Sequence, residues 1–221
     1  VKEAGVVGMG GAGFPTHVKL SPKNEGDIDT IIVNAAECEP YLTSDYRRIL
    51  EETDKLINGL KIVLRIFPKA TGHIAVEDNK PDAIKLLQEK TQGENRIVVD
   101  TLRTKYPQGG ERCLIYAVTK RKINSSMLPA DAGCIVHNVD TIVSIYNAVM
   151  EKRPLTRRIV TVTGDAVKNP RNFLVYVGTP YTEIAEAAGG FISEPEKMIS
   201  GGPMMGFAMY SLNVPVTKNT S

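Results

Sequence analysis

Cysteine is scarce in this sequence of 221 residues, which contains only Cys38, Cys113 and Cys134. Their number is odd, their spacing is wide, and no two of them form a Cys-x-x-Cys pair. This pattern excludes a disulfide-stapled framework and argues against a zinc or iron–sulfur site within the chain. We expect three reduced thiols, as in a protein of the reducing cytoplasm.

Histidine is equally scarce. His17, His73 and His137 have no mutual spacing typical of a metal-binding triad. No arrangement of Ser, His and Asp for nucleophilic catalysis can be recognised either. We therefore predict neither a metal site nor a catalytic side chain.

Long apolar runs and a strong net charge are also missing. No stretch approaches the roughly 18 apolar residues needed to cross a bilayer, so no transmembrane segment is predicted. With 27 basic and 25 acidic residues the net charge is +2, which gives no electrostatic reason to expect nucleic acid. The sequence starts without an initiator Met or an apolar signal region, and we expect it to be a piece of a longer protein.

What is present is the composition of a globular protein, 42% hydrophobic and 24% charged, with a regular pattern over the first 155 residues. Strands are expected at 31–34, 72–77 and 96–100, and helices at 44–67, from Pro81, after Gly109-Gly110, and from Asn138 to Pro154. This alternation predicts an α/β fold with a mainly parallel, Rossmann-like layered sheet. Ligands of such sheets bind at the carboxyl ends of the strands, which directs attention to the loops after Val33 and Val99.

The pattern changes after Pro154. Strands are expected at 158–163 and 173–177, a helix at 182–188, and a short strand at Met198-Ile199. This order suggests a small α+β module of the β-grasp kind. We therefore expect a first domain at 1–155, a β-grasp-like module at 156–206, and at 207–221 the start of a following segment.

The segment Gly8-Met9-Gly10-Gly11-Ala12-Gly13 satisfies the pattern G-x-G-x-x-G. Glycine-rich turns allow backbone N–H groups to approach a phosphate closely. Only Val6-Val7 precede it where a strand is usual, so an ordinary glycine-rich loop is an equal interpretation. Lys19 could direct a charge at a phosphate, or it could be a solvated lysine.

A second polar segment, Asn34-Ala35-Ala36-Glu37-Cys38-Glu39-Pro40, follows the first expected strand. Two carboxylates and an amide at a strand end could hold a ribose, the edge of a flavin ring or a metal. Two acids alone bind a metal poorly, however. A polar loop that only connects the strand to the next helix is the alternative.

Two further segments lie at expected helix starts. Gln108-Gly109-Gly110-Glu111-Arg112 would expose N–H donors and the positive end of a helix dipole. His137-Asn138-Val139-Asp140-Thr141 places Asn138 at a helix N-cap. Both Glu111 and Asn138 are also common in these positions without any further function.

Taken together, these segments resemble those of the RnfC family, the NADH-facing subunits of the Rnf ion-translocating ferredoxin:NAD oxidoreductases. More distantly they are similar to the FMN- and NADH-binding subunit of respiratory complex I and to cobalamin reductases. The resemblance covers about Gly5 to Gly206, and its last part is similar to the β-grasp module called SLBB. The segments that carry it are Gly8-Met9-Gly10-Gly11-Ala12-Gly13-Phe14-Pro15-Thr16, Asn34-Ala35-Ala36-Glu37-Cys38-Glu39-Pro40, Tyr106-Pro107-Gln108-Gly109-Gly110-Glu111 and His137-Asn138-Val139-Asp140-Thr141.

The resemblance implies a complex I-like FMN domain that holds FMN noncovalently, with NADH stacked on its ring. The residues at positions matching the family's cofactor contacts are Gly8, Gly10, Gly11, Gly13, Phe14, Lys19, Asn34, Glu37, Cys38, Glu39, Gly110, Glu111 and Asn138. The glycine-rich loop and Lys19 would line the nucleotide pocket, and Phe14 would contact the adenine. Asn34, Glu37, Cys38, Gly110 and Glu111 would lie against the flavin, Glu39 near NADH, and Asn138 near the flavin phosphate.

Four positions depart from the complex I pattern. Met9 replaces an Arg, Ala36 an Asp, Arg112 a Glu, and Pro22 an aromatic residue that would stack on adenine. The positive charge of Arg112 near the ring is expected to raise the flavin potential. The departures weaken the expected NADH contacts more than the expected flavin contacts.

The function implied by the resemblance is an NADH-facing electron-transfer subunit. Hydride would pass between NAD(H) and FMN, and electrons would continue to two [4Fe–4S] clusters, coupled to ion translocation. The clusters of the family sit on cysteine runs that this sequence lacks, so we expect them only in a C-terminal part absent from it. The expected partners are NADH and the other Rnf subunits, at the cytoplasmic face of a bacterial cell membrane. The alternatives are a cobalamin reductase-like flavoprotein and a scaffold module without redox function.

Overall fold

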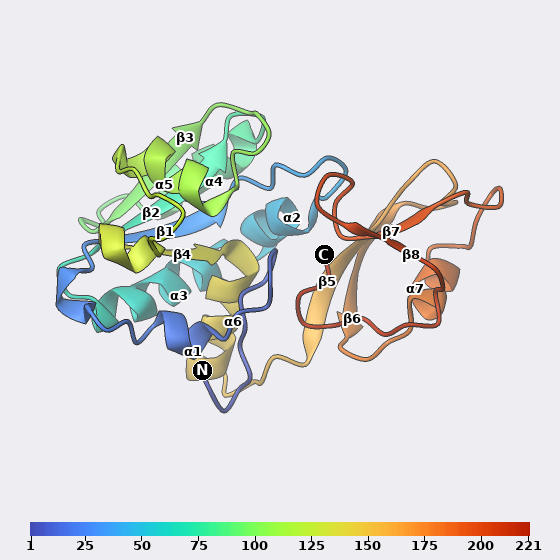
Figure 1. Cartoon of the computed structure of the whole chain (residues 1–221), viewed down its shortest axis with the longest axis horizontal. Helices are drawn as coiled ribbons and strands as arrows, with labels where there is room; N and C mark the ends of the chain where they lie inside the picture. The colour runs from blue at the N-terminus through green and yellow to red at the C-terminus, as the bar shows by residue number, and fades with distance from the viewer.

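The structure, a computed structural model, describes residues 1–221 and divides into two parts lying side by side (Figure 1). The strands of the first part are β1 (Thr30–Ala35), β2 (Thr71–Glu77), β3 (Ile97–Leu102) and β4 (Cys134–Asn138). Its α-helices are α1 (Thr16–Lys19), α2 (Ser44–Glu51), α3 (Thr53–Ile66), α4 (Pro81–Lys90), α5 (Glu111–Thr119) and α6 (Val139–Met150), and two 3₁₀ turns lie at Glu25–Asp27 and Pro129–Ala132. The second part contains β5 (Arg157–Val162), β6 (Arg171–Tyr176), α7 (Tyr181–Ala187), β7 (Met198–Ser200) and β8 (Phe207–Met209).

The four strands of the first part form a parallel sheet in the order β3-β2-β1-β4, which confirms the predicted α/β class. The chain moves outward from β1 to β2 and β3, and then returns to place β4 on the other side of β1. The direction of the connections therefore reverses between β1 and β4. In an open parallel sheet this switch point, at the carboxyl ends of the two strands, is where ligands bind.

Both faces of the sheet are largely buried along β1, β2 and β4, whereas the edge strand β3 is partly exposed. One face packs against α3, α4 and α6 through a core that includes Leu60, Leu87 and Ile142. The opposite face is covered by α5, where Leu114 and Ile115 contact residues of the sheet. Helices thus cover the sheet on two sides and leave its carboxyl edge as the place for a site.

The second part contains two antiparallel pairs, β5 with β6 and β7 with β8. Its small core is formed by Val160 on β5, Ile184 on α7 and Val216 near the end of the chain. The strands expected at 158–163 and 173–177 and the helix expected at 182–188 lie within one or two residues of the observed bounds. Strand β8 and the buried Val216 lie in the segment 207–221 and pack as parts of this unit.

Two predictions for the first part differ from the structure. The single helix expected over 44–67 is broken at Glu52, whose backbone (φ −128°, ψ 35°) is not helical. The break allows α2 to turn toward β5 while α3 runs along α6. Strand β4 follows Gly133, which has a left-handed backbone, and ends at Asn138. It is not among the strands that the sequence pattern predicts.

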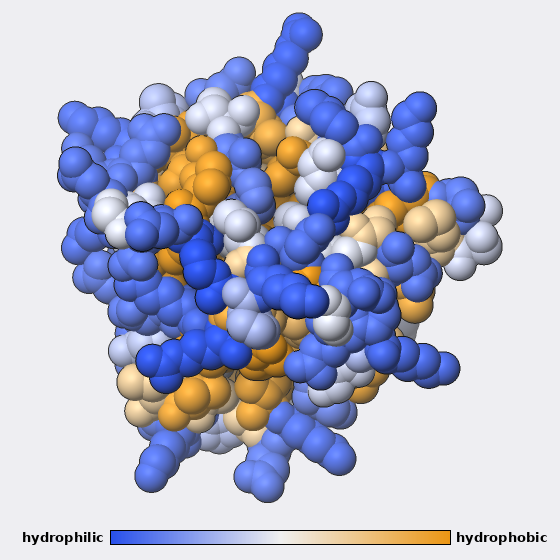
Figure 2. All heavy atoms as spheres, turned by 90° about the vertical axis from the view of Figure 1, so that its left-hand side faces the viewer, coloured by the Kyte–Doolittle hydropathy of each residue, from blue (hydrophilic) through white to orange (hydrophobic).

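No helix in the structure combines the length and the apolar character that a membrane crossing needs. The face of the first part that points away from the second is mostly hydrophilic, with apolar atoms in small patches between charged side chains (Figure 2).

Candidate functional site

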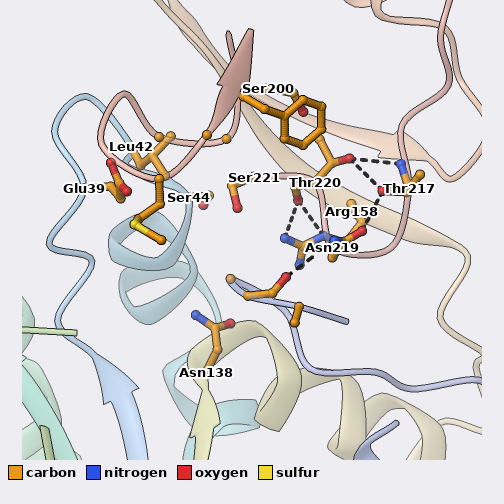
Figure 3. Close-up of a pocket in the computed structure, with 18 of the residues that line it drawn as sticks. Glu39, Leu42, Ser44, Asn138, Arg158, Ser200, Thr217, Asn219, Thr220 and Ser221 are labelled. Carbon is orange, nitrogen blue, oxygen red and sulfur yellow. Dashed lines mark hydrogen bonds between the residues drawn. The ribbon is translucent and has the colours of Figure 1, made fainter. Parts of the chain in front are cut away.

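Asn34 and Asn138 mark the switch point of the sheet. They are register partners at the carboxyl ends of β1 and β4, and both line a cavity of about 700 Å³. The cavity extends from this edge of the sheet to the second part of the chain (Figure 3). Its position agrees with the rule for ligand binding in open parallel sheets.

The glycine-rich loop forms one wall of the cavity. A bridge between Val7 and Pro15 closes the base of the loop, and Gly10 adopts a left-handed backbone (φ 72°). The Met9 N–H group donates to Thr141 Oγ1 at 2.9 Å, which ties the loop to α6. The N–H groups of Gly10, Gly11 and Ala12 donate to no group of the chain. Free N–H groups that line a cavity beside a helix start are suited to bind an anion.

Both its backbone and its surroundings favour glycine at position 10. The φ angle is left-handed, and a Cβ atom would lie 3.0 Å from Asn138 Nδ2, which would have to move to admit it. Asn138 also caps α6, because its Oδ1 accepts from the Asp140 N–H group at 2.8 Å. The predicted N-cap role of Asn138 is therefore confirmed.

The acidic loop after β1 forms the opposite wall. Glu37 has a left-handed backbone (φ 46°), and its carboxylate accepts from the N–H groups of Asp45 and Tyr46 at 2.7 and 3.1 Å. From behind, the Lys80 ammonium group donates to the Ala36 carbonyl at 2.8 Å. The loop is thus held from two sides in a conformation that a non-glycine residue seldom adopts.

Glu37 and Asp45 are unusual acids. Burial, together with the nearby Asp45 carboxylate, raises the pKa of Glu37 to about 8. Burial and the Asp140 carboxylate raise the pKa of Asp45 to about 6, although Asn138 donates to it. Both carboxyl groups in this wall of the cavity therefore keep their protons to higher pH than ordinary acids do.

Asn34 and Cys38 fix the turn that precedes α5. Asn34 Nδ2 donates to the Gly109 carbonyl at 2.9 Å, and the Gly109 N–H group donates to Cys38 Sγ at 3.3 Å. A Cβ atom on Gly109 would lie 3.1 Å from that sulfur. Burial raises the pKa of the Cys38 thiol, so the thiol stays protonated. Gly110 is the N-cap residue of α5.

Lys19 does not point into the cavity but joins three elements beside it. Its ammonium group lies 2.7 Å from Glu111 at the start of α5 and donates to the Val136 carbonyl of β4 at 2.9 Å. The adjacent His137 is buried, and burial together with the charge of Lys19 lowers its pKa to about 3. The imidazole is therefore neutral across the physiological pH range.

The second part of the chain completes the cavity. Glu39 of the acidic loop accepts the Met204 N–H group at 2.9 Å, while its other carboxylate oxygen is buried without a partner. A Cβ atom on Gly202 would overlap the Glu39 carboxylate, so the carboxylate can take this position because residue 202 is glycine. Arg158 of β5 also lines the cavity.

The structure brings seven of the thirteen predicted cofactor-binding residues into the cavity wall. These are Gly10, Gly11, Asn34, Glu37, Cys38, Glu39 and Asn138. The remaining six, which do not line it, are Gly8, Gly13, Phe14, Lys19, Gly110 and Glu111. Whether any of the thirteen contacts a cofactor stays a prediction.

The sequence interpretation missed Asp45, Gly109 and Arg158, all of which line the cavity. The sequence does contain one signal for Arg158. Side chains alternate between the two faces of a strand, so Arg158 and Val160 lie on the same, inward face of β5. Both are 3% exposed. A charged residue at an inward position of a strand requires a buried partner.

A parallel sheet with a glycine-rich loop of free N–H groups at its switch point defines an α/β domain of the class that binds nucleotide cofactors. The chain belongs to the Nuo51 FMN-binding domain family, whose sequence model matches residues 1–147. The model of the SLBB domain matches residues 159–208. The predicted FMN domain followed by an SLBB module is thereby confirmed.

The chain is 47% identical over 221 residues to the C subunit of the proton-translocating ferredoxin:NAD(+) oxidoreductase complex of Clostridium ljungdahlii, covering 100% of this chain and 48% of the relative. It is 46% identical to the C subunit of the Na(+)-translocating ferredoxin:NAD(+) oxidoreductase complex of Acetobacterium woodii, covering 100% of this chain and 50% of the relative. The chain thus spans about half the length of these curated relatives. The predicted similarity to the RnfC family is confirmed.

A solved structure, the NAD+-reducing [NiFe]-hydrogenase in the H2-reduced state, has the same fold. Its TM-score is 0.75 over 98% of this chain and 45% of that chain, at 18% sequence identity. At this identity the likeness supports the fold alone.

Proposed function

We propose that the chain is the FMN- and NADH-binding part of an ion-translocating ferredoxin:NAD oxidoreductase complex of the Rnf type. The observation that carries the proposal is the cavity at the switch point, which places Asn34, Asn138 and the glycine-rich loop together. The relatives that are 46–47% identical to this chain over all of its 221 residues are named as the C subunits of such complexes.

The residues of the cavity fit FMN. A volume of about 700 Å³ is within the range of cofactor sites. The free N–H groups of Gly10, Gly11 and Ala12 line the cavity and suit a phosphate. The buried Glu39 oxygen without a partner suits a hydroxyl or amide donor of a nucleotide.

When bound, FMN supplies the conversion between a two-electron donor and one-electron acceptors. The residues of this chain would bind FMN and NADH and orient them relative to each other. In the proposal, the glycine-rich loop and Asn138 hold the phosphate end, while Asn34 and Cys38 keep the Gly109 turn beside the ring. Glu39 accepts from NADH, and the raised pKa of Glu37 disfavours a second negative charge beside the ring.

The remaining parts of the function lie outside the chain. We place the two [4Fe–4S] clusters in the part of the longer protein that the chain does not include. We place the protein peripherally at the cytoplasmic face of the cell membrane, bound to the other Rnf subunits, which would couple electron transfer to ion movement.

The test is an anaerobic titration of the full-length protein and of the 221-residue chain with FMN, followed by addition of NADH. We expect saturable quenching of flavin fluorescence in both proteins and bleaching of the flavin absorbance by NADH. Binding of FMN without bleaching would remove NADH from the proposal. Absence of FMN binding in both proteins would overturn it and favour a scaffold without redox function.

A further inference from the structure

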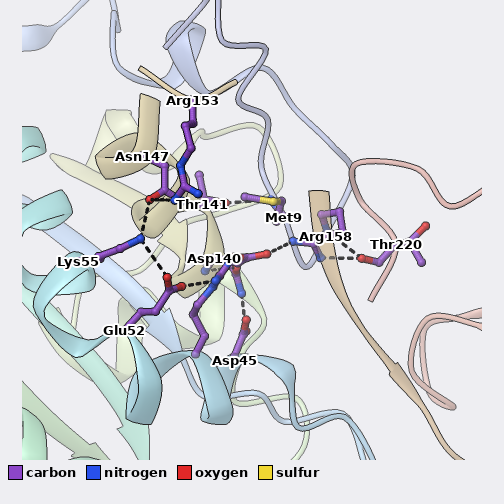
Figure 4. Close-up of polar contacts among 12 residues, drawn as sticks. Met9, Asp45, Glu52, Lys55, Asp140, Thr141, Asn147, Arg153, Arg158 and Thr220 are labelled. Carbon is purple, nitrogen blue, oxygen red and sulfur yellow. Dashed lines mark hydrogen bonds and ion pairs between the residues drawn. The ribbon is translucent and has the colours of Figure 1, made fainter. Parts of the chain in front are cut away.

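Arg158 is a buried cation of the second part that reaches into the first (Figure 4). Its Nη1 donates to Asp140 of α6, and its Nε and Nη2 both donate to the Thr220 carbonyl, at 3.0 and 2.6 Å. All three nitrogen atoms are thus engaged, one by α6 and two by the C-terminal segment. No other Lys or Arg lines the cavity.

The Asp140 side of this contact leads to two walls of the cavity. Asp140 Oδ1 accepts from Arg48 Nε and Nη2 of α2 at 2.9 and 2.6 Å, and α2 begins at the acidic loop. The Asp140 N–H group donates to Asn138 Oδ1, which fixes the Asn138 side chain against Gly10. A change in the position of Asp140 is therefore passed to Asn138.

The Thr220 side leads to the glycine-rich loop through residues 216–221, here called the strap. Val216 anchors the strap in the core of the second part. Lys218 Nζ donates to the Gly5 carbonyl at 2.6 Å, and Asn219 Nδ2 donates to the Gly11 carbonyl at 3.5 Å. The strap thus lies along the glycine-rich loop, and its last residues line the cavity in Figure 3.

We propose that Arg158 is a positioning residue for the cofactor site. It holds Asn138 through Asp140 and the glycine-rich loop through the strap, and so sets the separation of the two groups between which the phosphate end of FMN would bind. The planar guanidinium group can hold a carboxylate and a carbonyl at once, whereas an ammonium group is a single point of charge. The inference rests on the proposed function.

The test compares Arg158→Lys and Arg158→Gln with the matched control Arg157→Gln in the full-length protein. Arg157 is the exposed neighbour on β5 and lies over the ring of Tyr176, 4.4 Å from its centroid. The dissociation constant for FMN is measured by fluorescence quenching, and hydrogen exchange is measured for residues 9–13 and 217–221. A further variant, Lys218→Met, releases the strap from Gly5 without leaving a buried charge.

We expect Arg158→Lys to retain the ion pair with Asp140 but to lose the two-pronged bond to Thr220. Exchange in both segments should rise, and FMN affinity should fall by about tenfold, with a larger loss in Arg158→Gln and none in Arg157→Gln. Lys218→Met should raise exchange in residues 9–13 while the thermal midpoint stays unchanged.

Two results would overturn the inference. One is wild-type FMN affinity and wild-type exchange in Arg158→Lys. The other is faster exchange throughout β5 to β8 with no change in residues 9–13, which indicates a role in stability alone. If the wild-type protein binds no FMN, the proposed function fails, while the exchange measurements still decide whether Arg158 couples the strap to the loop.

Discussion

Asn138 is joined to Asp45 by a hydrogen bond that closes the junction between β4 and the start of α2. The amide group serves both helices, because its oxygen caps α6 and its nitrogen donates to a buried acid. An aspartate could perform the first role but not the second.

Replacement of Asn138 by Ala or Asp separates the two roles. Asn138→Ala should lower the free energy of unfolding by about 1 kcal/mol, since it removes an N-cap. Asn138→Asp keeps the cap but faces Asp45 with a second carboxylate, so its stability should fall as pH rises from 5 to 8. Urea denaturation at both pH values measures this, and equal pH dependence in Asn138→Asp and wild type would contradict it.

Glu37 makes stability dependent on pH in the direction opposite to that of a salt-bridged acid. Its pKa in the folded protein, about 8, lies above its ordinary value, so the folded state binds the extra proton between the two values. The stabilising contribution is complete at low pH and is lost as pH rises through about 8. In Glu37→Gln this dependence, up to about 1.4 kcal/mol per pH unit, should disappear. Chemical denaturation from pH 5 to 9 tests this, and an unchanged slope would refute the assignment to Glu37.

Gly202→Ala should displace Glu39, because the added methyl group would occupy the position of its carboxylate. We expect the KM for NADH to rise about five- to tenfold, equivalent to about 1 kcal/mol, with a smaller change in kcat. Gly26→Ala is the control, since a Cβ atom there meets nothing within 4 Å. Equal KM values in both variants would remove Glu39 from the proposed NADH contacts.

Gly59 on α3 allows this helix to pack closely on α6. A Cβ atom at this position would lie 2.4 Å from the Ile142 carbonyl oxygen. Gly59→Ala should therefore force the helices apart and lower the free energy of unfolding by about 1–3 kcal/mol, despite the better helix propensity of alanine. Thermal denaturation measures the loss, and a stabilised variant would show that the interface adapts.

Local pattern is sufficient to predict β1, β2 and β3, because each contains a run rich in β-branched residues. It is not sufficient for β4, where a strand of five residues ends in His137 and Asn138 and merges with the helix start. The break at Glu52 also has no local signal. Arg48 of α2 is held by Asp140 of α6, a contact 92 residues away in the sequence.

The residues of the candidate site also divide into those that local sequence predicts and those that depend on distant contacts. The glycine-rich and acidic loops are recognisable because their residue types carry a chemistry of their own. The wall supplied by the second part is not recognisable as part of a site. The pattern of β5 can show that Arg158 is buried, but Gly202 and Arg158 reach the cavity only through the packing of one part on the other. Even within the first part, the family resemblance points to Gly110, and Gly109, which it does not name, lines the cavity.

The ion pair between Arg158 and Asp140 also limits how the two parts can be recombined. A chimera that joins this FMN domain to an SLBB module from another protein would bury Asp140 without its second cation, unless the graft supplied an arginine at the position of Arg158. Arg48 would still pair with the other Asp140 oxygen, so the expected cost is that of one hydrogen bond to a charged group, about 1.5–3 kcal/mol. An SLBB module can therefore replace this one without loss of stability only if it carries an arginine at the same position.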